Sequence, residues 1–102
     1  MATTRKQLSP VSPGRILRQE FMDELGLSAN SLARMLRVPP NRITGIINGT
    51  RTITADTALR LARYFGTTEQ FWMNLRTLYE LELARRERGK EIRRTVRPRP
   101  AA

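Results

Sequence analysis

The sequence contains no cysteine and no histidine. The missing cysteine excludes disulfide bonds, thiolate zinc sites and cysteine nucleophiles, and the missing histidine excludes histidine-based triads, histidine metal sites and a histidine pH switch. No apolar run reaches the roughly 18–20 residues that span a bilayer. The amino end also lacks the apolar segment of a secretory signal, so we expect a cytoplasmic protein with no membrane contact.

Acidic residues are scarce, since 9 Asp and Glu stand against 19 Lys and Arg, which gives a formal net charge of +10 over 102 residues. A chain of this length corresponds to one small domain. Strong positive charge on a small domain points first to nucleic acid as the partner. The carboxylates are too few and scattered for two-metal chemistry, and no nucleophile is combined with a base, so we expect neither an enzyme nor a cofactor.

Charge and apolar content divide the chain into three segments. Residues 85–102 hold eight Lys and Arg against two Glu, with little apolar material. Such a segment cannot bury enough surface to offset the entropy lost on ordering, so residues 89–102 are predicted to be a disordered basic tail. Residues 1–11 are predicted to be flexible, and residues 12–88 to form the folded domain.

Helix start and stop signals predict five helices and no strand in the folded domain, so the predicted fold class is all-α. Each helix is expected to begin at a capping side chain or a proline, and most are expected to end at a glycine. Between these signals, apolar residues recur at helical spacing. The expected starts are Ser12-Pro13, Ser28, Pro40, Thr54 and Thr67 or Thr68. The last helix is expected to be the longest.

Residues 28–49 have the layout of a helix-turn-helix, with two helices of about eight residues joined by a short turn. Arg37 stands where this motif usually has a glycine with positive φ, which costs a non-glycine residue about 1–2 kcal/mol. The core positions of the motif carry suitable residues, namely Ala33, Val38, Ile43 and Ile46. On a basic domain, this combination favours DNA binding over a plain helical bundle.

Two segments make the pattern more specific. Residues 38–43 read Val-Pro-Pro-Asn-Arg-Ile, and residues 71–75 read Phe-Trp-Met-Asn-Leu. With these segments the chain resembles the HigA antitoxins of the lambda-repressor-like (Xre) helix-turn-helix group, and the resemblance covers about residues 12–84. Arg15 departs from an acid that is usual in the family, and Arg76 departs from a frequent glutamine.

The resemblance implies two tasks and no catalytic activity. HigA antitoxins bind and silence a HigB toxin, a RelE-like ribonuclease that cleaves messenger RNA at the ribosome. They also repress their own operon by binding an inverted repeat in double-stranded operator DNA as a homodimer. The expected partners are therefore operator DNA, a HigB/RelE-like toxin and a second copy of the chain.

The residues expected to contact DNA follow from the helix-turn-helix layout. The first residues of the second helix project into the major groove, where Arg42 can pair with guanine and Asn41 with adenine. Gly45 is interpreted as a point where the backbone approaches the duplex closely. The predicted base-reading residues are Pro40, Asn41, Arg42, Thr44 and Gly45. Helix amino ends and flanking polar residues supply the predicted phosphate contacts, namely Ser28, Asn30, Ser31, Arg37, Thr50 and Arg51.

The last predicted helix has more apolar surface than one small core needs. One stripe is expected to close the domain and another to form a two-fold interface, because reading a palindrome requires two recognition helices. The predicted dimer interface consists of Trp72, Leu75, Leu78, Tyr79 and Leu83. The resemblance implies a basic toxin, so the predicted toxin contacts are the acids of the first helix, Glu20, Asp23 and Glu24.

Two other functions remain open on the sequence. A solitary Xre-type repressor would have the same DNA-binding residues but no toxin partner. A neighbouring gene for a RelE-like chain would distinguish the antitoxin from such a repressor. An adaptor would use the helix-turn-helix fold for protein contacts alone, and it would show no salt-dependent binding to its own promoter.

Overall fold

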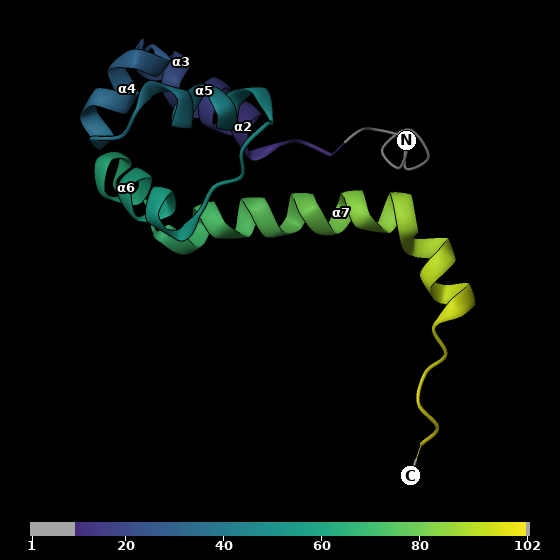
Figure 1. The fold of residues 1–102 in the computed structure, drawn as a ribbon. Helices are drawn as coiled ribbons and strands as arrows, with labels where there is room; N and C mark the ends of the chain where they lie inside the picture. The colour runs from purple at the N-terminus through teal and green to yellow at the C-terminus, as the bar shows by residue number, and fades with distance from the viewer. Residues whose placement is uncertain (1–9, 102) are drawn as a thin grey trace.

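A computed structural model describes residues 10–101, and every regular element in that range is a helix. Figure 1 shows α7 as a long helix that runs beneath the others and continues past them. The elements are α2 (Pro13–Ile16), η1 (Leu17–Met22), α3 (Asp23–Leu25), α4 (Ala29–Leu36), α5 (Pro40–Asn48), α6 (Ala55–Phe65) and α7 (Glu69–Thr95).

The predicted all-α fold is confirmed for the described residues. The elements α2, η1 and α3 follow one another without a break, so they correspond to the first of the five expected helices. Residues 1–9 of the predicted flexible segment 1–11, together with residue 102, lie outside the described part of the chain.

Four of the five helix starts have side-chain caps at the expected residues, whereas α5 begins with Pro40 at its first position and has no side-chain cap. Each capping hydroxyl oxygen accepts a hydrogen bond from a backbone N–H in the first turn and so satisfies a donor that the helix leaves free. The pairs are Ser12 with Arg15 at 3.2 Å, Ser28 with Ser31 at 3.1 Å, Thr54 with Thr57 at 3.3 Å, and Thr68 with Phe71 at 3.1 Å.

The middle of the first helix has π-helical geometry between Leu17 and Met22, which the sequence signals did not predict. A π-turn bonds residues five apart in place of four, and so changes which side chains share a face. Leu17 and Met22 are five residues apart and are both buried. The π-turn therefore brings both side chains into the core.

The core joins the first helix, α6 and α7 through a cluster of aromatic rings. Trp72 is fully buried, and its ring centroid lies 4.8 Å from that of Phe21 and 6.1 Å from that of Phe65. The indole N–H donates to Oγ1 of Thr67 at 2.7 Å, so the one polar atom of this ring is satisfied. The cluster holds the start of α7 against the domain.

The amino end of α2 packs directly on the backbone of α5. Gly14 is buried, and a Cβ built there would lie 2.0 Å from the carbonyl oxygen of Ile46. Only a residue without a side chain permits this approach. The Pro13-Gly14 start of the first helix therefore fixes where α5 lies.

We expect Gly14→Ala to lower the free energy of unfolding by about 1–3 kcal/mol, because the added methyl group meets backbone atoms that cannot move aside. Urea denaturation followed by circular dichroism measures the change. Gly89→Ala is a matched control, since a Cβ there would meet only the side chain of Arg93 at 3.4 Å. The control should raise stability by about 0.5–1 kcal/mol. Equal midpoints for the two variants would contradict the close packing of α2 on α5.

The long α7 corrects the prediction for the carboxyl end of the chain. Residues 89–102 were expected to be a disordered tail, but the helix continues through Thr95. Helix nucleation is the costly step, and here the packed first half of α7 supplies the nucleus. Ion pairs at i,i+3 and i,i+4 support the exposed half, including Arg86 with Glu82 at 3.2 Å and Arg94 with Glu91 at 2.9 Å. Residues 96–101 follow the helix without regular structure.

Candidate nucleic-acid interface

The helices α4 and α5 form the predicted helix-turn-helix. Ile43 and Ile46 are buried and fix the inner side of α5, while Pro40, Asn41 and Thr44 are exposed on its outer side. Thr44 donates its hydroxyl hydrogen to the carbonyl of Pro40 at 3.4 Å. Three of the five predicted base-reading residues therefore lie on an open helix face.

The turn between α4 and α5 contains the strained residue that the motif predicts. Arg37 has φ 61° and is the one non-glycine residue with positive φ in the described chain. Arg60, on α6, donates from Nη1 to the carbonyl oxygens of Leu36 at 2.8 Å and of Arg37 at 3.5 Å. These bonds satisfy carbonyls at the carboxyl end of α4 and hold the left-handed turn.

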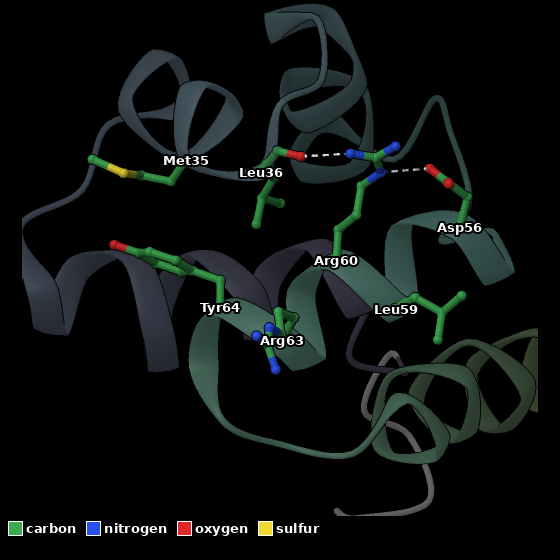
Figure 2. A pocket seen from close by; sticks show the side chains of 7 residues that line it. All are labelled: Met35, Leu36, Asp56, Leu59, Arg60, Arg63 and Tyr64. Atoms are coloured by element: carbon green, nitrogen blue, oxygen red, sulfur yellow. Dashed lines mark hydrogen bonds and ion pairs between the residues drawn. The ribbon is translucent and has the colours of Figure 1, made fainter.

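Arg42 makes an ion pair that the sequence signals did not predict. Its Nη1 lies 2.6 Å from Oδ2 of Asp56, and the same oxygen lies 2.9 Å from Nε of Arg60. Figure 2 shows Arg60 between Asp56 and the carbonyl of Leu36. Asp56 thus links α5 to α6 and, through Arg60, to the turn after α4.

The two guanidinium groups also set the charge of Asp56. The hydrogen bond from Arg60, and then that from Arg42, lowers the pKa of this carboxyl below its ordinary value. Asp56 therefore stays ionised at neutral pH, and the pairing is lost only as the pH falls through the lowered pKa. The i,i+4 spacing of Asp56 and Arg60 signals an ion pair within α6, whereas the link to Arg42 depends on how α6 packs.

Gly45 corrects the fifth predicted base-reading residue. It is buried, and a Cβ there would lie 2.7 Å from both Cγ and Cδ of Arg51. The backbone N–H groups of Thr50 and Arg51 donate to the carbonyl of Gly45 at 2.9 and 3.0 Å. The missing side chain makes room for the aliphatic part of Arg51. Internal packing therefore explains why a glycine is found here, and the interpretation of Gly45 as a close approach to DNA is wrong.

The predicted phosphate-contact residues lie at the two ends of α4 and in the loop after α5. Ser28 is used as a helix cap, and its hydroxyl also donates to Oγ of Ser31 at 2.9 Å. Asn30 and Arg37 are exposed near the ends of α4. Thr50 is exposed after α5, and its hydroxyl donates to the carbonyl of Gly45 at 3.3 Å.

Arg51 completes a basic surface beside α5. It is exposed and lines one shallow depression together with Arg42, Arg60 and the start of α6. Arg42 and Arg60 pair there with the carboxylate of Asp56, and Arg51 lines the same depression from the loop after α5. This surface and the exposed side of α5 form the candidate interface.

Comparison with known proteins decides the family. The helix-turn-helix family model matches residues 17–72. The solved structure of an addiction module antidote protein of the HigA family from Coxiella burnetii is 49% identical, with a TM-score of 0.85 over 90% of this chain and 100% of that chain. The chain belongs to the HigA family. This assignment confirms the resemblance drawn from the sequence.

Two further relatives cover nearly the same range. The antitoxin HigA of Pseudomonas aeruginosa, solved with the higBA promoter, is 45% identical with a TM-score of 0.84 over 87% of this chain and 97% of that chain. Virulence-associated protein I of Dichelobacter nodosus is 46% identical over 84 residues, which are 82% of this chain and 78% of that protein. The similarity therefore extends over the HigA fold as a whole.

The residues predicted for a HigA dimer interface lie on different sides of α7. Trp72 is 0% exposed and belongs to the core, so its assignment to the interface is wrong. Leu75, Tyr79 and Leu83 are half-buried, at the helical spacing of Trp72. Leu78 is 65% exposed, and Leu81, which was not predicted, is 45% exposed. The apolar surface left open on α7 is thus its outer side.

The predicted toxin-contact residues are all accessible. Glu20, Asp23 and Glu24 are exposed on η1 and α3, and α3 ends at Gly26. Within residues 10–101, no group of His, Cys, Asp or Glu is arranged to hold a metal ion. The same residues include no helix with the length and hydropathy to cross a membrane.

Proposed function

We propose that this HigA family member represses its own operon by binding an inverted repeat as a homodimer, and that it neutralises a HigB/RelE-like toxin that cleaves messenger RNA. The observation that carries the DNA-binding half is the exposed side of α5 beside the basic surface of Arg42, Arg51 and Arg60. The relative solved with the higBA promoter supports a promoter as the ligand.

The exposed side of α5 enters the major groove. Asn41 presents an amide that pairs with adenine, and Thr44 offers a hydroxyl and a methyl group to neighbouring base edges. Arg42 gives one donor to Asp56, and a guanidinium has five, so it keeps donors for guanine. Asp56 and Arg60 hold Arg42 in place, which reduces the side-chain entropy that binding would otherwise cost.

The loop after α5 contacts the DNA backbone. Thr50 and Arg51 precede α6 and sit beside the groove-facing helix, where phosphates pass. A homodimer places two copies of α5 one DNA turn apart, about 34–36 Å. The exposed leucines on the outer side of α7, Leu78 and Leu81, supply apolar surface for the two-fold contact.

The DNA-binding half is tested with the segment upstream of the reading frame for this chain. A fluorescently labelled duplex of that segment should bind the full chain much more tightly than a scrambled duplex of the same length. The affinity for both should fall as salt rises, because the phosphate contacts release counterions. Equal affinity for the two duplexes would contradict sequence-specific repression, and no binding to either would favour an adaptor.

The toxin-binding half rests on the acids of the first helix. RNA-binding toxins are basic, and Glu20, Asp23 and Glu24 present negative charge on an exposed surface. Co-expression with a neighbouring RelE-like reading frame should give a complex that co-purifies and should restore growth. Failure of both, with operator binding intact, would favour a solitary repressor.

We expect Asp23→Lys/Glu24→Lys to weaken the complex with the toxin by at least tenfold, since it replaces attraction with repulsion at the contact. Glu87→Lys/Glu91→Lys, on α7, makes the same change in net charge and should leave the affinity within a factor of about two. Titration calorimetry of the purified proteins measures both. Similar losses for the two variants would show that only the total charge matters and would contradict this contact surface.

A further inference from the structure

The carboxyl-terminal half of α7 leaves the domain and stands in solvent. Residues 84–101 are exposed, apart from Gly89, which is half-buried. The first half of α7 packs against α6 and α2, and Figure 1 shows the helix continuing past them, with its last turns bent. The sequence places eight Lys and Arg and two Glu in residues 85–102. Most of the net positive charge of the protein, +6 of +10, is thus carried on this projecting arm.

One side of α7 changes from apolar to basic where the helix leaves the domain. The side that packs inward is marked by Trp72, Tyr79 and Leu83. Continuing at steps of three and four residues, the same side next presents Arg86, Lys90 and Arg93. These three residues are called the basic stripe below. The stripe extends the line of the packed side into the open space beside the domain.

The charge of the arm is only partly offset within the chain. Glu82 pairs with Arg85 and Arg86, and Glu91 pairs with Arg94. Among the ion pairs of residues 10–101, none involves Lys90 or Arg93, and the same holds for the three other basic residues of the arm, Arg88, Arg97 and Arg99. These cations remain available to an external anion.

The basic stripe begins about two turns of α7 after the point where the loop with the predicted phosphate contacts meets this helix. Nη1 of Arg76 donates to the carbonyl of Ile53 at 3.1 Å, which fixes this loop on α7. Arg51 and Tyr79 line the same small cleft at that junction. At 1.5 Å per residue, Lys90 follows Tyr79 along the helix by about 16 Å. That distance corresponds to a few phosphates along a DNA strand.

We infer that the basic stripe is a second phosphate-binding surface, which contacts the DNA backbone outside the half-site read by α5. The inference rests on the proposed DNA-binding function. The ligand is double-stranded DNA, because Arg51, a predicted phosphate contact beside α5, shares a cleft with Tyr79, which precedes the stripe on the same side of α7. A formed helix holds its cations in place, so it loses less conformational entropy on binding than a disordered tail. Contacts of this kind are independent of base sequence.

The test compares two double variants of the full chain that remove the same charge from the same helix. Lys90→Gln/Arg93→Gln removes two residues of the stripe, and Arg85→Gln/Arg88→Gln removes two residues that lie off it. Binding to the upstream duplex and to a scrambled duplex is measured between 50 mM and 200 mM salt, and circular dichroism checks helix content. The stripe variant should lose roughly one to two orders of magnitude in affinity for both duplexes at about 0.1 M salt. Its salt slope should fall by about two, one for each phosphate contact.

The outcomes separate the possible failures. The control variant should keep its affinity within about twofold, with an unchanged salt slope, and Lys90→Arg/Arg93→Lys should behave like the parent chain. A stripe variant that binds DNA as the parent does, at equal helix content, would overturn the inference and leave the proposed function intact. The same holds if that variant loses only toxin binding or self-association. If the parent chain fails to bind the upstream duplex, the proposed function itself fails.

Discussion

Trp72→Ala is expected to remove a large part of the free energy of unfolding, and most of it if the chain is only marginally stable. The ring is fully buried, packs against Phe21 and Phe65, and holds the start of α7 through its bond to Thr67. Truncating a buried tryptophan costs about 3–5 kcal/mol, and a domain of this size has a total stability of about 5–15 kcal/mol. Urea denaturation followed by circular dichroism should show a midpoint shifted strongly toward zero urea, or no folded baseline.

Phe71→Ala is the matched control for this prediction. Phe71 is the neighbouring aromatic residue, but it is 37% exposed and lies at the rim of the same cluster. Its truncation should cost clearly less than that of Trp72. If Trp72→Ala instead kept a folded monomer and abolished self-association, the ring would belong to a dimer interface, and its place in the core would be contradicted.

Local signals in the sequence were sufficient for much of the fold. Caps such as Ser28 and Thr54 act within one helix turn, so they can be recognised without the tertiary structure. The positive φ of Arg37 was predicted in the same way, because it follows from the spacing of the turn after Ala33. The packing of α4 against α5 follows from the apolar residues of the motif.

The errors and omissions arose where the local sequence is compatible with more than one tertiary arrangement. Trp72 and Leu78 both belong to apolar stripes of the last helix, and the sequence does not state which stripe faces the domain. Gly45 has no side chain whether the space is filled by DNA or by Arg51. The ion pair between Arg42 and Asp56 joins residues 14 positions apart, so it depends on how α5 and α6 pack.

The projecting half of α7 was misjudged for an energetic reason. Composition alone assigns a basic segment with few apolar residues to disorder, because it treats the segment as isolated. Here the segment continues a helix already nucleated by the core around Trp72, and each added residue needs only the cost of propagation. The acids Glu82 and Glu91 then pair with arginines one turn away.

The ion pair with Asp56 gives Arg42 two possible roles that differ in their energetics. Arg42 either contacts a base or only joins α5 to α6. A base contact with two hydrogen bonds discriminates between bases by about 1–3 kcal/mol, whereas an exposed ion pair is screened by water and adds little to stability. Asp56→Asn removes the ion pair and leaves the arginine, so the two roles can be separated.

Arg42→Lys is expected to lower the affinity for the upstream duplex by about 5- to 150-fold, while the affinity for a scrambled duplex stays within about twofold. Lysine keeps the positive charge but loses the fork of donors that pairs with guanine. Fluorescence anisotropy with both duplexes measures the difference, and Arg63→Lys, an exposed residue on α6, is the matched control. Arg51→Gln should weaken both duplexes alike and reduce the salt slope by about one.

Asp56→Asn decides between the two roles of Arg42. If Arg42 reads a base, Asp56→Asn should preserve most of the discrimination between the two duplexes, because the guanidinium remains and Arg60 still holds the turn at Leu36. If Asp56→Asn and Arg42→Lys lose discrimination equally, and the double variant loses no more than either, the two residues act as one unit. That result would show that Arg42 reads its base only while Asp56 holds it in place. Unchanged discrimination in Arg42→Lys would contradict a base contact by Arg42 and would leave Asn41 and Thr44 as the residues of α5 that read sequence.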